Sequence, residues 1–250
     1  MNGKEIRLRQ LYKTPERLFV LPLDHGITLG PVSGLKDIQD VVGKVSKTVD
    51  AVVVHKGLVQ RITDSLDHQG CKLIVHLSAS TALAPDSSKK ELVTSVEHAL
   101  SIGASAVSIH VNLGSPAENQ MLLDLGKTAE ICDIWGIPLL AMMYVRDGSA
   151  KSEYDPEKVR HSARVAEELG ADIVKVNYTG NIETFQDITE SVKIPVIIAG
   201  GPKMASDSDL LSMISDAVVA GAKGVAIGRN VFQHETPDVL AGKIRSILGK

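Results

Sequence analysis

One lysine interrupts the apolar segment Ile173–Val176 of this 250-residue sequence. A lysine buried in such a segment loses its hydration, which favours the neutral amine. A neutral amine is a nucleophile that can form a Schiff base with the carbonyl group of a substrate. The alternative is that Lys175 extends to the molecular surface or pairs with a carboxylate. Because the segment reads as a central strand, we favour a catalytic role for Lys175.

Two further residues could move the protons that Schiff-base chemistry requires. Asp24 follows the apolar segment Phe19–Leu23, and Tyr144 ends another apolar segment. A carboxylate and a phenol facing an amine could help to form and dehydrate a carbinolamine and to make or break a carbon–carbon bond. The alternative for Asp24 is that it only forms a turn before Gly26. The alternative for Tyr144 is that it is a half-buried aromatic side chain at the end of its strand.

A phosphate site is predicted where two late apolar segments end. Gly200 and Gly201 follow one of them, and Gly228 follows the other, so backbone N–H groups could approach an anion closely. Lys203 and Arg229 add positive charge at matching places. The alternative is that the glycines only make tight turns, which leaves the two basic residues unexplained.

Histidines suggest a different chemistry, a metal-dependent hydrolase. One histidine lies near the end of each of the first four apolar segments, namely His25, His55, His76 and His110. However, the sequence contains no His-x-His pair and no His-Glu-x-x-His motif, and lone strand histidines are usually satisfied core residues. Asp24 and His25 are adjacent, so both can face inward only with a local twist of the strand. We therefore predict no metal.

The elements that must position these residues alternate regularly. Eight short apolar segments are expected as parallel strands covered on both faces: Arg17–His25, Asp50–Gly57, Lys72–Ala79, Ala106–Gly114, Pro138–Val145, Asp172–Tyr178, Pro195–Gly201 and Gly224–Asn230. Segments between them have helical spacing: Lys36–Lys47, Lys89–Ile102 (preceded by Ser87 and Ser88), Ala117–Trp135, Asp155–Leu169 and Ser206–Val219. A helix is also expected over Met1–Tyr12, where it could cap the barrel or meet a neighbouring subunit.

This alternation predicts an α/β fold, a single (β/α)8 TIM barrel with an N-terminal helix, as one domain over residues 1–250. Gly-Ala pairs at Gly103, Gly170 and Gly221 each follow a helical segment, where glycine ends a helix in the left-handed conformation. An open doubly wound sheet is the alternative, but no Gly-x-Gly-x-x-Gly follows the first strand. In a barrel, functional groups gather at the carboxyl ends of the strands.

Composition excludes several partners. With 27 Lys+Arg, 30 Asp+Glu and a net charge of −3, the chain is not basic enough to favour nucleic acid. It has no apolar stretch long enough for a membrane span and no signal-peptide core, so we expect a cytoplasmic protein. Its two cysteines, Cys71 and Cys132, are too few for a disulfide framework and are expected to pack in the interior.

Five motifs in order resemble the DeoC/FbaB class I aldolases of archaeal type, along essentially the whole chain. They are Asp24-His25-Gly26, Met142-Met143-Tyr144, Val174-Lys175-Val176, Ala199-Gly200-Gly201-Pro202-Lys203 and Gly228-Arg229. The family are barrel enzymes with a Schiff-base lysine on the sixth strand. Ala141–Tyr144 looks most like the 2-amino-3,7-dideoxy-D-threo-hept-6-ulosonate synthase branch. The archaeal-type fructose-bisphosphate aldolases tend to carry tryptophan where this chain has Met142.

The resemblance implies roles for particular residues. Lys175 would form the Schiff base, Tyr144 would donate protons and Asp24 would accept them. The sugar phosphate would also contact His25, Gly26, Ile27, Thr28, Val145, Arg146, Gly200, Gly201, Gly228 and Arg229. The family commonly reads Tyr-Pro-Arg-Gly after the fifth strand. This chain instead has Val145 in place of proline and an extra Asp147, in the loop that faces the acceptor.

These observations predict a class I aldolase or transaldolase that acts on a phosphorylated ketose, with no cofactor beyond the covalent imine. By resemblance, the acceptor is L-aspartate 4-semialdehyde, which a close cousin condenses with dihydroxyacetone phosphate, and the product feeds an aromatic-type pathway. Alternatives within the family are cleavage of fructose 1,6-bisphosphate and thiolytic acyl transfer. Alternatives from other classes are the metal-dependent hydrolase and a non-catalytic phosphate sensor. The family usually assembles, so we expect a homo-oligomer.

Overall fold

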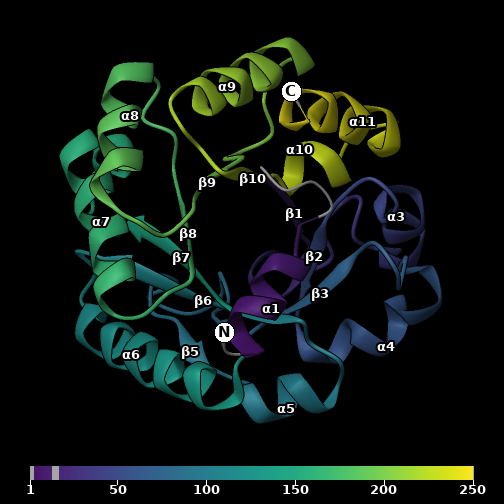
Figure 1. Cartoon of the computed structure of the whole chain (residues 1–250), viewed down its shortest axis with the longest axis horizontal. Coiled ribbons are helices and arrows are strands. Elements are labelled where there is room, and N and C mark those ends of the chain that lie inside the picture. The colour runs from purple at the N-terminus through teal and green to yellow at the C-terminus, as the bar shows by residue number, and fades with distance from the viewer. Residues whose placement is uncertain (1–2, 13–16, 250) are drawn as a thin grey trace.

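Eight parallel strands close into a barrel in the computed structural model, which describes residues 3–12 and 17–249 (Figure 1). The barrel confirms the predicted fold, and each predicted apolar segment contains one of its strands. In the order in which neighbours pair, the strands are β1 (Leu18–Pro22), β10 (Gly224–Ala226), β9 (Val196–Ala199), β8 (Ile173–Val176), β7 (Leu139–Val145), β6 (Ala106–Leu113), β3 (Lys72–His76) and β2 (Ala51–Val54).

Helices surround the barrel (Figure 1). The longer ones are α3 (Ile38–Val45), α6 (Glu118–Trp135), α7 (Pro156–Glu168), α8 (Ile182–Ser191), α9 (Asp207–Val219) and α11 (Pro237–Leu248). Shorter ones are α2 (Gly26–Leu29), α4 (Val59–Ile62), α5 (Val96–Ser101) and α10 (Arg229–Phe232), with 3-10 turns at Lys56–Leu58, Thr63–Ser65 and Ala150–Tyr154.

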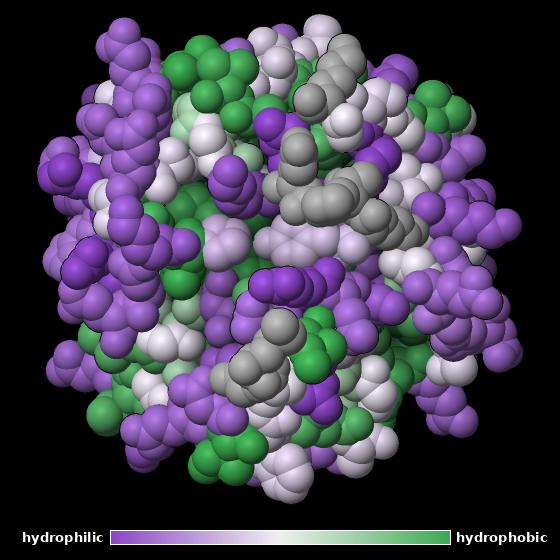
Figure 2. Space-filling view, in the orientation of Figure 1, coloured by the Kyte–Doolittle hydropathy of each residue, from purple (hydrophilic) through white to green (hydrophobic). Residues whose placement is uncertain are grey.

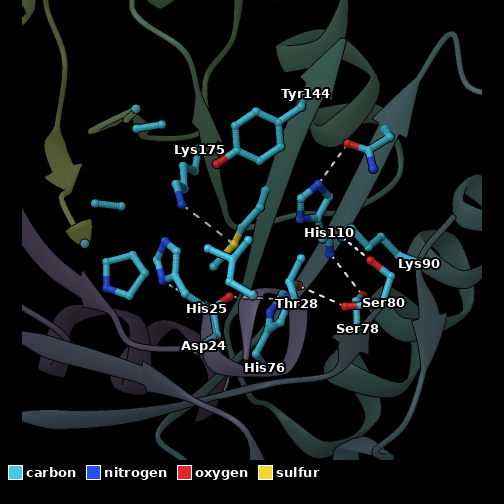
Figure 3. A pocket seen from close by; sticks show the side chains of 18 of the residues that line it. Asp24, His25, Thr28, His76, Ser78, Ser80, Lys90, His110, Tyr144 and Lys175 are labelled. Atoms are coloured by element: carbon cyan, nitrogen blue, oxygen red, sulfur yellow. Dashed lines mark hydrogen bonds and ion pairs between the residues drawn. The ribbon is translucent and has the colours of Figure 1, made fainter. Parts of the chain in front are cut away.

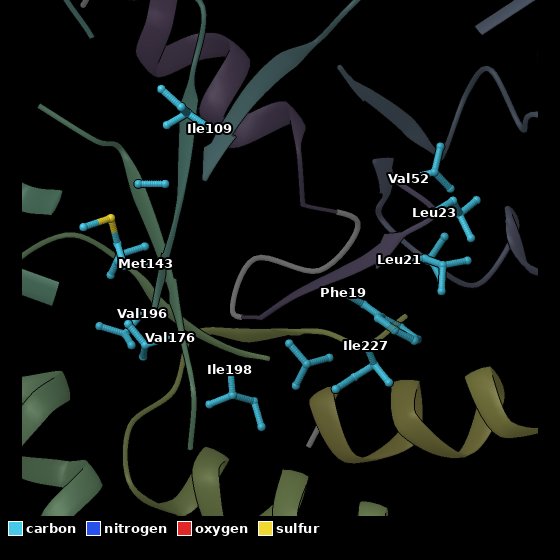
Figure 4. Close-up of a cluster of buried hydrophobic side chains, with 14 of the residues drawn as sticks. Phe19, Leu21, Leu23, Val52, Ile109, Met143, Val176, Val196, Ile198 and Ile227 are labelled. Atoms are coloured by element: carbon cyan, nitrogen blue, oxygen red, sulfur yellow. The ribbon is translucent and has the colours of Figure 1, made fainter. Parts of the chain in front are cut away.

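Alternation along the strands divides the buried side chains into two clusters. Phe19 and Leu21 of β1 face outward and pack under the helices, in the cluster shown in Figure 4. Leu18 and Val20 of the same strand face inward and join the interior cluster of the barrel. This period of two is the geometry of an extended strand. The strands are therefore apolar on both faces, as the sequence predicted.

Helix α1 (Gly3–Gln10) covers the amino-terminal end of the barrel, and the following turn continues the cover. Leu11 is 1% exposed and belongs to the interior cluster, against which Leu8 and Tyr12 pack. Lys4 fixes the helix to the barrel through ion pairs with Asp133 and Asp172. Of the two roles that we predicted for this segment, the structure supports the cap. Residues 1 and 2 of the predicted helix lie outside the described residues.

Glycine ends three helical segments as predicted. Gly103, Gly170 and Gly221 have φ values of +94°, +90° and +92°. These left-handed conformations cost a residue with a side chain about 1 kcal/mol or more, because its Cβ would crowd the backbone. Asp155 and Ser206 cap α7 and α9, and their side chains accept hydrogen bonds from the backbone N–H groups of Lys158 and Asp209.

One predicted helix is wrong over its first half. Residues 91–92 of the segment Lys89–Ile102 form strand β5 (Glu91–Leu92), which pairs antiparallel with β4 (Ser78–Ala79). Helix α5 begins only at Val96, after Ser95 has capped it by accepting a hydrogen bond from His98 N–H. Ser87 and Ser88 therefore belong to a hairpin loop rather than to a helix start.

Hydrophilic side chains cover most of the face shown in Figure 2, and hydrophobic ones form separate patches. Of the helices in the part of the chain that is described, none is long and apolar enough to cross a membrane.

Candidate active site

A cavity of about 430 Å³ opens where the barrel strands end (Figure 3). It brings together most of the residues that the sequence singled out. The predicted residues that line it are Asp24, His25, Ile27, Thr28, Tyr144, Arg146, Lys175, Gly200, Gly201, Gly228 and Arg229. The other three histidines of the predicted set also line it, namely His55, His76 and His110.

Lys175 projects from β8 into this cavity and is only 7% exposed. Its register on the neighbouring strand places it beside Met142, whose Sδ lies 3.9 Å from Lys175 Nζ. The same Nζ lies 5.8 Å from the centre of the Tyr144 ring. Among the described residues, Lys175 forms no ion pair with a carboxylate. The contacts of Lys175 therefore differ from the alternative that we considered for it, in which it pairs with a carboxylate.

Asp24 lies among histidines. Its Oδ1 is 3.6 Å from His25 Nδ1, and its Oδ2 is 3.7 Å from His76 Nε2. Burial alone would raise the pKa of Asp24, but His76, His25 and Lys175 outweigh it and hold that pKa well below its usual range. Asp24 is therefore a carboxylate at neutral pH, as a proton acceptor must be.

Asp24 and His25 both line the cavity because the strand has already ended. Strand β1 stops at Pro22, and His25 has helical dihedral angles (φ −67°, ψ −25°) as the residue before α2. The alternation of side chains along a strand no longer applies there, so Asp24 and His25 can both face the cavity although they are adjacent in the sequence.

Tyr144 is half-buried at the end of β7. Its ring centre lies 4.9 Å from that of His110, and Arg146 Cζ lies 5.4 Å from it. His110 is itself oriented by Asn112, whose Oδ1 is 2.8 Å from His110 Nε2. Arg146 forms an ion pair with Glu153, a residue that the sequence analysis missed. The phenol is thus held in place from two sides.

The histidines are poor candidates for a metal site. No group of three or more His, Cys, Asp or Glu residues in the described part of the chain could hold a metal ion. His76 Nδ1 instead lies 2.8 Å from Ser108 Oγ. Burial lowers the pKa of His76 to about 4, despite the opposing effect of Asp24. The histidine is therefore neutral at neutral pH and serves as a hydrogen-bonding group.

The predicted phosphate site has glycines that no larger residue could replace easily. A Cβ on Gly228 would lie 2.7 Å from His25 Cε1 and 2.9 Å from the Pro22 carbonyl oxygen. Gly201 has a φ of +63°, a conformation that favours glycine. Arg229 follows Gly228 at the cavity wall, and its Nε has no hydrogen-bond partner among the described residues. The backbone N–H of Gly200 already donates to the Ala226 carbonyl oxygen at 3.3 Å, so the site offers an anion the N–H groups of Gly201 and Gly228 and the guanidinium of Arg229.

Asn230 fastens the two glycine segments together, and the sequence analysis missed it. Its Nδ2 donates to the carbonyl oxygens of Gly200 (3.0 Å) and Pro202 (3.2 Å), and its Oδ1 accepts a hydrogen bond from Met204 N–H (2.7 Å). The residue is 4% exposed. A polar residue placed directly after a Gly-Arg pair, at the end of an apolar strand, was the available signal.

Three predicted contact residues lie outside the cavity lining. Lys203 points away, because its Nζ donates to the Gln233 carbonyl oxygen at 2.8 Å. Val145 is 5% exposed and packs at the end of β7, on the face opposite Tyr144. Gly26 begins α2 and has no side chain to reach the cavity. The positive charge of the predicted phosphate site therefore comes from Arg229 rather than from Lys203.

The chain is similar to proteins of one enzyme family. The DeoC/LacD family aldolase profile matches residues 18–234. Relatives include 2-amino-3,7-dideoxy-D-threo-hept-6-ulosonate synthase 1 of Archaeoglobus fulgidus, which is 46% identical over 99% of this chain and 92% of the relative. Another is 2-amino-4,5-dihydroxy-6-oxo-7-(phosphonooxy)heptanoate synthase of Streptomyces griseus, 44% identical over 98% of this chain and 90% of the relative.

The chain is also similar to a solved structure of an aldolase. A Schiff base forming fructose-1,6-bisphosphate aldolase, studied through its reaction intermediates, has a TM-score of 0.90 and 30% sequence identity, over 99% of this chain and 100% of that chain. These matches extend over nearly the full length of both partners, and they include a class I enzyme with the same barrel. The chain therefore belongs to the DeoC/LacD family of aldolases.

Proposed function

We propose that this chain is a class I aldolase or transaldolase that joins an enamine, derived from a phosphorylated ketose, to L-aspartate 4-semialdehyde. The observation that carries the proposal is Lys175, an amine buried in a cavity wall with no carboxylate partner among the described residues. A buried lysine in an otherwise apolar strand has no evident structural purpose there.

Lys175 Nζ attacks the ketone carbon of the donor, and the ketone oxygen takes up a proton to give a carbinolamine. Loss of water then leaves a protonated imine, which withdraws electrons from the adjacent carbon. Removal of a proton there, or cleavage of the adjacent carbon–carbon bond, gives an enamine. The enamine carbon attacks the acceptor aldehyde, whose oxygen is protonated, and water releases the product from Lys175.

The surrounding residues supply the proton transfers. Lys175 Nζ lies 5.8 Å from the centre of the Tyr144 ring, which supports the phenol as the group that protonates a leaving hydroxyl group or an acceptor oxygen. Asp24 is ionised and lines the same cavity as Lys175, so its negative charge stabilises the positive charge on the imine. The donor phosphate binds the backbone N–H groups at Gly201 and Gly228 and the guanidinium of Arg229, because the N–H of Gly200 already donates to the Ala226 carbonyl oxygen. This contact fixes the ketone near the amine.

The acceptor follows from the products that name the two relatives. Both names describe seven-carbon amino acids with a carboxylate at one end, an amino group on carbon 2 and a ketone on carbon 6. An imine at carbon 6 makes carbon 5 the attacking atom, so the acceptor contributes carbons 1 to 4. A four-carbon 2-amino acid with an aldehyde at the far end is aspartate semialdehyde.

We further propose that residues 1–250 work as one domain, in the cytoplasm and as a homo-oligomer. Arg17 NH1 donates to the Leu248 carbonyl oxygen, which joins the residue before β1 to the last turn of α11. Helix α6 leaves Leu123, Ile134 and Trp135 exposed, and these apolar side chains support an interface between subunits.

Borohydride trapping tests the central step. The protein is mixed with dihydroxyacetone phosphate, fructose 1,6-bisphosphate or a deoxyketofructose phosphate, reduced, digested and mapped by mass spectrometry. We expect a stable adduct on Lys175 that is lost in Lys175→Met and kept in the matched control Lys223→Met. The ketose that traps identifies the donor. An adduct that survives Lys175→Met, or no adduct with any ketose, would overturn the proposal.

A further inference from the structure

A second cation reaches the cavity from the wall that faces the predicted phosphate site. Lys90 lies just before β5 and lines the cavity, although neighbouring Lys89 faces solvent and pairs with Glu91. Lys90 Nζ donates to Ser80 Oγ at 2.5 Å. In Figure 3, Lys90 and Lys175 reach into the pocket from opposite sides. In the sequence, Lys90 lies in a segment with helical spacing, and its residue type alone indicates no role there.

The hairpin β4–β5 holds Lys90 in place. Thr28 Oγ1 donates to the Ser80 carbonyl oxygen at 2.9 Å, and Ser80 Oγ donates to the Ser87 carbonyl oxygen at 2.8 Å. Asn112 Nδ2 donates to the Ser88 carbonyl oxygen at 2.6 Å. The two-stranded ribbon is therefore tied to α2 and to β6, and the ammonium of Lys90 occupies a fixed position. A preorganised charge binds an anion with a smaller entropic cost than a mobile one.

The charge of Lys90 has no counterion in the described part of the chain. Burial lowers the pKa of Lys90, Asp24 opposes this effect, and Arg146 adds to it. Two cations, Lys90 and Arg146, thus lie close enough to repel each other, and only Arg146 has an acidic partner, Glu153. A bound anion would relieve that repulsion and replace the hydration that Lys90 has lost.

The barrel order places this wall opposite the glycine segments. Around the closed sheet, β3 lies four strands from β9, and β6 lies four strands from β10. Lys90 follows β3 and β4 in the chain and lies against β6, whereas Gly200 and Gly228 follow β9 and β10. Lys175, on β8, lies between the two walls. A substrate complex with one anion at each end and a reacting carbon in the middle matches this arrangement.

We propose that Lys90, together with Arg146, binds the anionic group of the acceptor aldehyde, which is the carboxylate of the semialdehyde. The proposal deepens the proposed function and rests on it. Lys90 selects acceptors with a negative charge at the end distant from the aldehyde, because a neutral acceptor would leave the ammonium of Lys90 without a counterion beside a second cation, Arg146. Glyceraldehyde 3-phosphate also has a negative charge, its phosphate, at the end distant from the aldehyde. The test must therefore distinguish a carboxylate from a phosphate.

The experiment compares Lys90→Met with the matched neighbour Lys89→Met. For each we measure kcat/KM with aspartate semialdehyde, with glyceraldehyde 3-phosphate and with a neutral aldehyde, propanal. A hydrogen bond to a charged group contributes about 1.5 to 3 kcal/mol, so we expect Lys90→Met to lower the ratio of semialdehyde to propanal rates roughly 10- to 100-fold. Lys89→Met keeps the wild-type ratio, and Lys90→Arg recovers much of it.

Trapping of the donor separates the failure of this proposal from the failure of the proposed function. If the wild-type protein forms no ketose adduct on Lys175, the proposed function fails, and the acceptor site fails with it. If the adduct forms and Lys90→Met, folded by circular dichroism, keeps the wild-type ratio, only the Lys90 assignment is overturned. A loss confined to glyceraldehyde 3-phosphate would overturn the carboxylate in favour of a phosphate.

Discussion

His76 and Ser108 are joined inside the barrel wall by a contact of 2.8 Å between His76 Nδ1 and Ser108 Oγ. This contact leaves His76 Nε2 facing Asp24, 3.7 Å from its carboxylate. A histidine fixed in this way keeps one orientation towards the carboxylate of Asp24. It also couples the protonation of the site to the stability of the fold.

Stability should fall as the pH falls from about 6.5 to about 4. His76 has a folded-state pKa of about 4, below the ordinary value of 6.5, so in this window the unfolded chain binds a proton that the folded chain does not. The lowered pKa of Asp24 acts in the same direction at still lower pH. Urea unfolding at about pH 7 and about pH 5 measures the change. His76→Gln should reduce it, and the exposed control His68→Gln should not; an equal pH dependence in all three proteins would refute the assignment.

Tyr144→Phe should lower kcat by roughly 10²- to 10⁴-fold, the usual contribution of a positioned acid or base. The ring keeps its contact with His110, so the unfolding free energy should change little. Stopped-flow or coupled assays over a range of pH measure the loss. A fall smaller than about tenfold would assign the proton transfer to another group.

Asn230→Ala should raise the KM for the donor and lower the unfolding free energy by about 1 to 3 kcal/mol, because it leaves buried backbone groups without partners. Asn181→Ala is the matched control. Asn181 caps α8 by accepting a hydrogen bond from Thr184 N–H, away from the cavity. That variant should lose about 1 kcal/mol of stability with an unchanged KM. Equal effects on KM would show that Asn230 acts only through stability.

Gly228→Ala should abolish donor binding or folding, because its Cβ would lie 2.7 Å from His25 Cε1. Gly126→Ala provides the contrast, since a Cβ on Gly126 in α6 would meet nothing within 4 Å. That helical substitution should stabilise the fold by about 0.5 to 1 kcal/mol. Calorimetric titration with dihydroxyacetone phosphate and thermal unfolding measure both effects. Wild-type affinity in Gly228→Ala would argue against a phosphate in this part of the cavity.

Incubation with EDTA should leave the aldol rate unchanged. Of the four histidines that line the cavity, His76 contacts Ser108, His110 contacts Asn112 and His25 lies near Asp24. No group of three or more His, Cys, Asp or Glu among the described residues could hold a metal ion. The aldol rate is compared before and after dialysis against the chelator, which tests whether the reaction needs a bound metal ion. Loss of activity that zinc restores would favour the metal-dependent hydrolase.

Strand and helix alternation made the barrel predictable, because hydrophobic periodicity and the glycines at Gly103, Gly170 and Gly221 depend on local chain geometry. Lys175, Tyr144 and Asp24 were predictable as candidates because polar residues at the ends of apolar strands are conspicuous. Their proximity depends on the pairing of the strands around the barrel, which brings the ends of distant segments of the chain together.

The roles of three polar residues, Lys203, Lys90 and Asn230, depend on tertiary contacts and could not be predicted from the sequence. The direction of Lys203 is set by the Gln233 carbonyl, a partner 30 residues away. Lys90 was hidden because its segment has helical spacing, yet pairing with Ser78 and Ala79 makes the beginning of that segment a strand. Asn230 could be seen as a polar residue, but its role depends on a loop from another strand.

Helix α1, which covers the amino-terminal end of the barrel, has a kinetic consequence. Among the described residues the cavity opens at the opposite end, so donor and acceptor would share one route to Lys175. The donor must react first, since the acceptor can be attacked only by an enamine that has already formed on Lys175. Turnover should thus be ordered, and excess acceptor should inhibit it by occupying the shared cavity of the free enzyme.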